Sequence, residues 1–311
     1  MHTLTIAACA AACALLAGCA TSTRDPGAPA TREVDLQLLR GIEQGRLDLV
    51  QAALEEGADP RARSEGLFFG QSALELAIDE APTDVALLRC LLDAGADPEE
   101  VLHSFDERPL QLLARRGSPE AIELFLERGA ELARGDESGE TPLHVAAKAG
   151  NLAAVEFLIA RGHPLECRGS NGRTPLLAAC AQRRLDVVRA LIARGADPLA
   201  VTRDGRSALV LAGWVNPELL RCLLEVGVDP ERPGAQGERL VHLVPDAPSP
   251  EAAGRCLEVL RAHGVDFDAL DSDGRTLFER LDLAARELQA AYRRDLARLE
   301  ALRAACVAAQ R

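Results

Sequence analysis

The chain has 311 residues, of which 48% are hydrophobic and only 3% aromatic, so its core must consist mainly of leucine, alanine and valine. Its formal net charge of −13 disfavours nucleic-acid backbones and anionic lipid headgroups as main partners. This composition is typical of stacked short helices, and it predicts one elongated all-α fold.

At the N-terminus, an apolar run from Leu4 to Leu16 contains no charged side chain and is shorter than the roughly 20 residues of a membrane-spanning helix. It leads into Leu-Ala-Gly-Cys, ending at Cys19, which resembles the lipobox of bacterial lipoproteins. The resemblance implies that residues 1–18 are a signal peptide and that Cys19 is lipidated. It also implies that Ala20 directs the chain to the outer membrane, facing the periplasm. An ordinary secretory signal or a membrane-anchor helix is the alternative.

Residues 19–33 are predicted to be a lipid-anchored, disordered tether. Residues 20–33 have no large apolar side chain and contain two prolines. A flexible chain of this length spans about 20 Å, so the folded part is expected to lie close to the membrane surface.

From residue 34 to residue 267, one pattern returns at regular intervals. The stretch Asp136–Gly162 shows it most clearly. Its Thr-Pro-Leu begins at Thr141, recurs at Thr174 and returns as Ser-Ala-Leu at Ser207, each time after 33 residues. A fixed period of this length indicates a repeat protein built from stacked units.

Each unit is predicted to hold two short helices. Thr141 is suited to cap the first helix, because its hydroxyl can accept from a free backbone N–H, and Pro142 is suited to the first helical position. Gly150 is expected to end this helix, and the second runs from Leu152 to its closing glycine, Gly162. Two such helices cannot bury their apolar faces alone, so neighbouring units must supply the core.

The period, the cap, the closing glycines and the Thr-Pro-Leu-His motif resemble the ankyrin repeat. The resemblance implies an all-α solenoid of about seven helix-turn-helix repeats, in which His144 bonds to neighbouring backbone. First helices are expected to begin near Asp35, Ala73, Pro109, Pro142, Pro175, Ala208 and Leu240. Second helices are expected to end at Gly57, Gly95, Gly129, Gly162, Gly195, Gly227 and Gly264. Tight hairpin tips with positive φ are predicted at Asn171-Gly172, Asp204-Gly205 and Asp273-Gly274.

Residues 268–311 are predicted to form a partial repeat and a long capping helix. From Leu281, apolar residues recur every three or four positions, which predicts one amphipathic helix. A solenoid needs such a terminal unit to cover its last open core face. A partner-binding or coiled-coil helix is the alternative.

No sequence motif indicates catalysis. Neither His144 nor His242 lies at metal-ligand spacing from a Cys, Asp or Glu, and the carboxylates are expected to be spread along solvated faces. Gly-X-Ser-X-Gly, phosphate-binding glycine loops and His-Glu-X-X-His are absent from the sequence. We therefore expect no catalytic residue, no metal site and no cofactor. Cys167 and Cys180 are close enough in sequence for a disulfide to be considered.

In ankyrin-like stacks, the hairpin tips and the exposed ends of the first helices line one concave surface that binds the partner. By register, Lys148 and Trp214 occupy such helix ends, and the chain's only tryptophan resembles a binding anchor. The alternative is that Trp214 packs over the loop near Asn216. The predicted partner-binding residues, which we call the tip patch, are Trp214, Arg173, Arg203, Arg206, Ser170, Asn171, Asp204 and Lys148.

An arginine-rich patch around an aromatic residue, on an otherwise acidic protein, suits a partner with an acidic or mixed surface. The sequence therefore predicts a monomeric, non-enzymatic module that binds another protein, binds no nucleic acid, and contacts the membrane only through its lipid. Two functions stay open. One is a scaffold or assembly factor for a periplasmic protein, and the other is an immunity or inhibitor protein that blocks a periplasmic toxin or enzyme.

Overall fold

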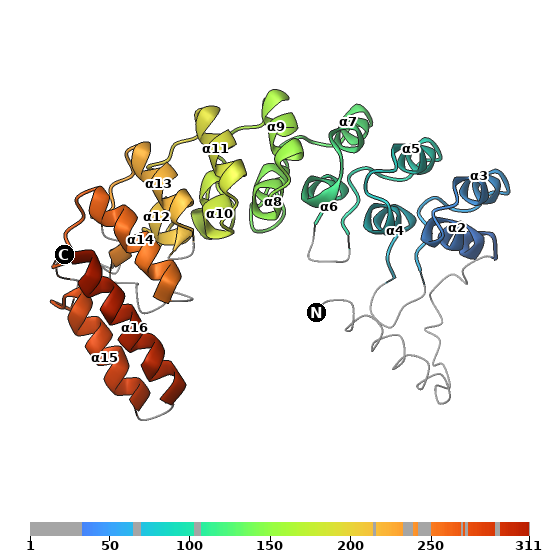
Figure 1. Cartoon of the computed structure of the whole chain (residues 1–311). Coiled ribbons are helices and arrows are strands. Elements are labelled where there is room, and N and C mark those ends of the chain that lie inside the picture. Colours follow the sequence, from blue (N-terminus) through green and yellow to red (C-terminus); the bar gives the residue numbers. More distant parts are fainter. Residues whose placement is uncertain are drawn as a thin grey trace.

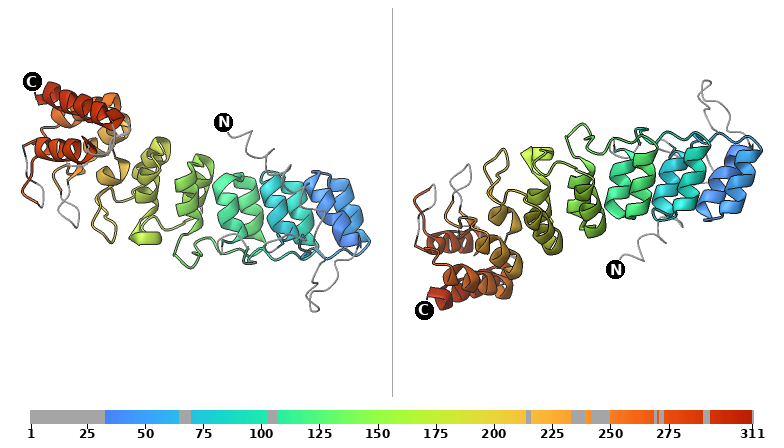
Figure 2. Two further views of the ribbon diagram at one scale, coloured as in Figure 1. Left: turned by 90° about the horizontal axis from the view of Figure 1, so that it is seen from below. Right: turned by 90° about the horizontal axis from the view of Figure 1, so that it is seen from above.

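The computed structural model describes residues 33–64, 70–102, 107–213, 216–232, 239–241, 250–268, 270, 273–289 and 293–310. Within these ranges the fold is all-α, and extended pairing is limited to two isolated bridges, Arg63 with Ser72 and Val201 with Ser207. The helices stack side by side into one curved row (Figure 1; Figure 2). The expected all-α solenoid is confirmed. The predicted signal peptide, Cys19 and the tether up to residue 32 lie outside the described residues.

Six helix pairs within the described ranges carry the repeat. They are α2 (Glu33–Glu43) with α3 (Leu47–Glu55), α4 (Ala73–Glu80) with α5 (Val85–Asp93), α6 (Pro109–Arg116) with α7 (Pro119–Glu127), α8 (Pro142–Ala149) with α9 (Leu152–Ala160), α10 (Pro175–Ala181) with α11 (Leu185–Ala193), and α12 (Ala208–Ala212) with α13 (Pro217–Glu225). Helices α4, α6, α8, α10 and α12 begin at the predicted residue, whereas α2 begins two residues before Asp35. The helix expected near Leu240 falls mostly outside the described residues.

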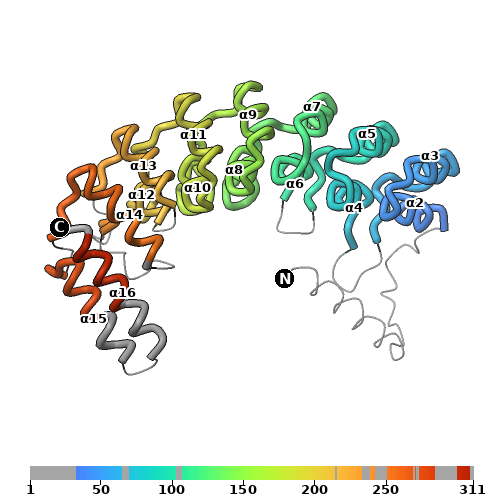
Figure 3. The backbone as a smooth tube through the Cα atoms, viewed as in Figure 1, coloured from blue at the N-terminus to red at the C-terminus, as the bar shows by residue number. Residues whose placement is uncertain are grey.

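The two helices of each pair lie in separate layers. The first helices line the concave side of the row and the second helices its convex side (Figure 1; Figure 3). Small residues let neighbouring inner helices approach closely: Ala146 and Ala147 are fully buried where α8 packs against α6 and α10. Leu143 and Leu176 fill the same core, with 0% and 1% of their surface exposed. One apolar core therefore runs through the whole row.

Glycines close the second helices as predicted. Gly162 has φ of 86°, a left-handed conformation that costs other residues about 1–2 kcal/mol. The equivalent glycines of the other units also have positive φ, namely Gly57, Gly95, Gly129, Gly195, Gly227 and Gly264. Asn171, Gly172, Gly205 and Gly274 have positive φ at the predicted hairpin tips. These turns confirm the seven predicted repeat ends.

Helix caps follow the sequence, with one variation. Thr174 Oγ1 accepts a hydrogen bond from the Leu177 amide at 3.3 Å, and Ser207 Oγ accepts from the Val210 amide at 3.4 Å. At Thr141 the hydroxyl instead lies 2.9 Å from His144 Nδ1, to which it donates. The histidine ring therefore takes over part of the capping in this repeat.

Carboxylates join successive repeats. Glu99 accepts a hydrogen bond from the Glu131 amide at 2.8 Å, and Glu166 accepts from the Asp197 amide at 2.9 Å. Glu231 accepts from the Asp266 amide at 2.9 Å in the same way, whereas Asp35, in α2, accepts from the Asp59 amide, which follows the second helix of its own pair. These bonds fix each hairpin to its neighbour and so position the side chains at the hairpin tips.

The C-terminal region differs from the prediction of one long helix. After α14 (Pro250–Ala262) the chain forms two helices, α15 (Leu277–Gln289) and α16 (Arg293–Gln310), which lie side by side (Figure 1). Arg303 Nη1 and Asp282 Oδ1 join them at 3.1 Å. Leu302 and Cys306 are fully buried where α16 packs against α14. A single straight helix would carry these side chains into water, so burial of apolar surface favours the fold-back.

Candidate functional site

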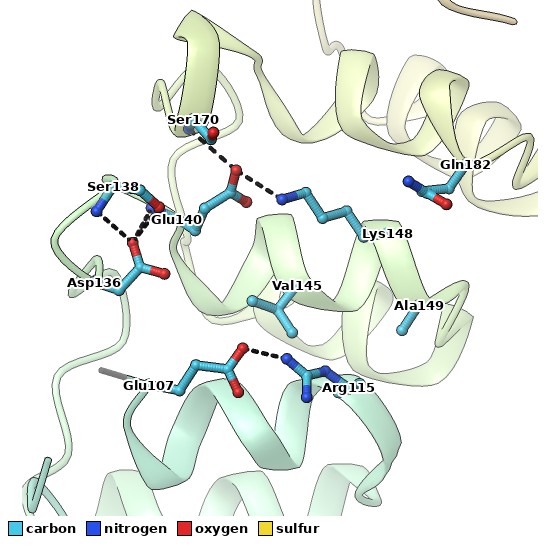
Figure 4. Close-up of a pocket in the computed structure, with 10 residues that line it drawn as sticks. All are labelled: Glu107, Arg115, Asp136, Ser138, Glu140, Val145, Lys148, Ala149, Ser170 and Gln182. Atoms are coloured by element: carbon cyan, nitrogen blue, oxygen red, sulfur yellow. Dashed lines mark hydrogen bonds and ion pairs between the residues drawn. The ribbon is translucent and has the colours of Figure 1, made fainter. Parts of the chain in front are cut away.

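A groove on the concave side of the row is the candidate site, and we call it the inner groove. It has a volume of about 440 Å³ and lies at α6, α8 and the end of α10, beside the hairpins that precede these helices (Figure 4). Its lining residues are Glu107, Arg115, Asp136, Ser138, Glu140, Val145, Lys148, Ala149, Ser170 and Gln182.

Two equivalent ion pairs flank the inner groove. Glu107 pairs with Arg115, and one repeat later Glu140 Oε1 pairs with Lys148 Nζ at 2.8 Å. In both pairs the carboxylate precedes the first helix and the cation lies in its last turn. Figure 4 shows the two pairs on either side of Val145. The repeat thus places two similar charge pairs around an apolar floor.

Glu140 is the most enclosed charged residue of the groove, with 4% of its surface exposed. Its Oε1 also accepts a hydrogen bond from the Ser170 amide at 3.1 Å, which ties the hairpin of the next repeat to this one. The second oxygen, Oε2, is buried and has no hydrogen-bond partner. A buried carboxylate oxygen in this state is costly, and most such groups in folded proteins are paired.

Glu107 occupies the corresponding position one repeat earlier and is 8% exposed. Burial raises the pKa of the Glu107 carboxyl, and the Arg115 guanidinium opposes this shift. The side chain of Arg115 is 42% exposed, so its charge faces the groove and the solvent.

His144 supports the hairpin behind the groove. Its Nδ1 accepts from the Thr141 amide at 3.2 Å, and its Nε2 donates to the Arg173 carbonyl at 2.9 Å. Because one ring nitrogen accepts and the other donates, the His144 ring is in its neutral form. Burial of the ring lowers the pKa of His144, which favours this form. The expected bonding of this histidine to neighbouring backbone is confirmed.

The structure brings six residues of the tip patch into two contiguous groups. Ser170 and Lys148 meet at Glu140 in the inner groove. At the adjoining tips, Asn171 Nδ2 donates to Asp204 Oδ1 at 3.0 Å, and Arg206 Nε lies 3.2 Å from Asp204 Oδ2. The Arg203 amide donates to the Asn171 carbonyl at 2.9 Å.

The other two residues of the tip patch, Arg173 and Trp214, do not belong to these two groups. Arg173 is half-buried, its carbonyl is used by His144, and its Nε is buried without a hydrogen-bond partner. Trp214 lies outside the described residues, so its orientation stays a prediction from the sequence. The helix before it, α12, has only five residues and ends at Ala212, with Gly213 as the residue that follows it.

The acidic residues of the inner groove were not predicted from the sequence. Glu107 and Glu140 were expected on solvated faces, but both are buried, and for Glu140 the following hairpin contributes through its Ser170 amide. The 33-residue period could have pointed to this position. Glu107 and Glu140 are equivalent in successive repeats, and the same position one and two repeats after Glu140 is occupied by Arg173 and Arg206. Acidic residues therefore change to arginines at one register along the row.

The cysteines do not form the disulfide that we considered. Cys180 is fully buried in α10, Cys167 Sγ lies 3.3 Å from the Pro164 carbonyl, and both are free thiols. Among the residues that the structure describes, no group of His, Cys, Asp or Glu is arranged to hold a metal ion. No helix of this described part combines the length and the apolar character needed to cross a membrane.

Comparison with known proteins identifies the repeat. Residues 80–168 and 160–233 match the family model for ankyrin repeats (3 copies). The crystal structure of the human ASB11 ankyrin repeat domain superposes with a TM-score of 0.61 and 26% sequence identity. The superposition covers 71% of this chain and 96% of that domain. No curated protein sequence matches the chain significantly.

Proposed function

Because this chain folds as an ankyrin-repeat solenoid, a fold that serves as a protein–protein interaction module, we propose that it is a non-enzymatic protein that binds one partner protein through its concave face. The observation that carries this proposal is the continuity of the inner groove with the hairpin tips at Asn171, Asp204 and Arg206. Together they offer carboxylates, guanidinium groups and an apolar floor, which suits a partner of mixed charge.

The partner is proposed to be a periplasmic protein, with this chain held at the outer membrane by a lipid on Cys19. The lipobox-like Leu-Ala-Gly-Cys and the polar linker after it support this placement. If the placement is right, a clickable palmitate analogue fed to expressing cells should label the wild-type chain and not the Cys19→Ser variant. Equal labelling of both chains, or none of either, would remove the lipid anchor from the account.

We favour a scaffold or assembly factor over an inhibitor. To distinguish them, the full chain in mild detergent is used to capture its partner from an envelope extract of the source cells, and the captured protein is identified by mass spectrometry. A scaffold should leave the partner's activity unchanged or raise it. Stoichiometric loss of the partner's activity on addition of the chain would favour the alternative, an immunity or inhibitor protein.

Trp214 is proposed as an anchor of this interaction on the sequence alone, since tryptophan in a desolvated contact often contributes about 2 kcal/mol or more. Replacing it with alanine should then weaken capture of the partner. Unchanged capture would support the alternative, in which Trp214 packs within its own repeat.

A further inference from the structure

Glu140 has one side-chain oxygen without a hydrogen-bond partner. This side chain is more than nine-tenths buried and lines the inner groove, and its Oε2 has no hydrogen-bond partner. The bonds from Ser170 and Lys148 both end on Oε1. Because Oε2 itself is buried, a donor in the groove can use its acceptor capacity when the side chains that cover it move aside.

The charges around Glu140 indicate which kind of hydrogen-bond donor the groove would bind. The groove contains three carboxylates, Glu107, Asp136 and Glu140, and two cations, Arg115 and Lys148, so one negative charge is in excess. Each cation is already paired with a carboxylate. Asp136 receives all three of its hydrogen bonds on Oδ1, and Figure 4 shows its other oxygen turned toward the groove.

We propose that the inner groove receives an arginine side chain of the partner protein, with Glu140 Oε2 and Asp136 as acceptors. This inference rests on the proposed protein-binding function. A guanidinium presents several N–H donors in one plane, which matches two carboxylates better than a compact ammonium does. Val145 and Ala149 offer an apolar surface to the stem of such a side chain. The net charge of −13 also attracts a basic group.

A probe at the groove is available without chemical modification, because Lys148 is the only lysine in the chain. Labelling the full chain in mild detergent with lysine that carries ¹³C only at Cε gives a spectrum with one side-chain signal, which reports on the inner groove. Two small molecules are titrated: N-acetylarginine amide and its neutral isostere, N-acetylcitrulline amide. The expected result is a saturable shift of the Lys148 signal with the arginine compound and none with the citrulline compound.

Three variants sharpen the test. Glu140→Gln should weaken binding of N-acetylarginine amide at least tenfold. Glu99→Gln is the matched control. Like Glu140, Glu99 accepts a hydrogen bond from a backbone amide of the next repeat and forms ion pairs, in its case with arginines. It lies outside the groove. The Arg115→Met variant removes a competing cation and should tighten binding. Because this gain cannot arise from a misfolded chain, it keeps the proposal testable if Glu140→Gln does not fold.

Two results would overturn the proposal. One is an equal response to both compounds, or no response to either. The other is submicromolar binding of N-acetylarginine amide alone, which would make the groove a small-molecule site rather than a contact for a partner's side chain. Since no partner is needed in this experiment, its failure leaves the proposed function to be judged by the capture experiment.

Discussion

At the scale of single residues, the burial of His163 has a direct consequence for the stability of the fold. It is 3% exposed and stands where other repeats have the alanines Ala58, Ala96 and Ala196. Its ring lies 2.9 Å from the Pro164 carbonyl through Nδ1, which donates, whereas Nε2 is buried without a partner. Burial lowers the pKa of His163 to about 4.

This shift predicts a pH dependence of stability. In the unfolded chain the His163 ring titrates near pH 6.5, so between about pH 6.5 and 4 the unfolded state binds more protons than the folded state. Stability should therefore fall as the pH drops through this window, with about 2 kcal/mol lost to this group at pH 5. Urea unfolding at pH 7.5 and pH 5 measures the loss, which should shrink in His163→Ala and persist in a control at the exposed His263, His263→Ala. Equal losses in wild type and His163→Ala would refute the assignment.

Two of the ten residues that line the inner groove were predicted from the sequence. Lys148 and Ser170 were predicted because they occupy fixed positions of the repeat, at a helix end and at a hairpin tip. Glu107 and Glu140 were missed because a carboxylate beside a turn looks solvated in sequence. Its burial depends on the next hairpin, whose Ser170 amide reaches back to Glu140. Such contacts between units do not show in the composition of one unit.

At the scale of helices, each unit depends on its neighbours for its core. Leu176 in α10 is 1% exposed, and α10 packs against both α8 and α12. Replacing it with alanine should cost about 2–5 kcal/mol, and hydrogen exchange should rise in α8 and α12 as well as in α10. Leu199→Ala, at a residue that is 50% exposed, is the control and should change little. Exchange that rises only within the mutated repeat would contradict this coupling.

The C-terminal helices are the part of the fold that sequence reasoning could not resolve. From Leu277 to Gln310 there is no glycine or proline, so nothing in the sequence marks a break. The break is favoured by tertiary packing, because it lets Leu302 and Cys306 reach α14. The regular repeats, in contrast, were predictable because their caps and closing glycines act locally.

The packing of α16 makes a prediction of its own. Leu302→Ala should increase hydrogen exchange in α14 and leave α4, at the other end of the row, unchanged, because the lost contact is local to the C-terminal end. Val307, which is 39% exposed on the same helix, supplies the control variant Val307→Ala. If α14 keeps its protection in Leu302→Ala, α16 does not act as the cap of the row.

At the scale of the whole molecule, charge changes along the concave face. The inner groove has an excess of carboxylates, whereas the adjoining tips carry Arg203 and Arg206 with Asp204 between them. A partner with a basic and an acidic part would bind in one orientation only. Affinity should fall as salt is raised from about 50 to 500 mM, since exposed charges are screened over shorter distances. An affinity independent of salt would argue for an apolar contact elsewhere.

The most direct test of the central claim compares two arginines that differ chiefly in location. Arg206 is 49% exposed and paired with Asp204 at the tips, and Arg221 is 46% exposed and paired with Glu218 on the outer helix α13. Isothermal titration of the captured partner against Arg206→Glu and Arg221→Glu decides whether the concave face binds. We predict at least a tenfold loss of affinity for Arg206→Glu, and for Arg221→Glu a change within about 0.5 kcal/mol, as for other neutral surface substitutions. Equal affinities of the two variants, or a loss confined to Arg221→Glu, would contradict binding through the concave face.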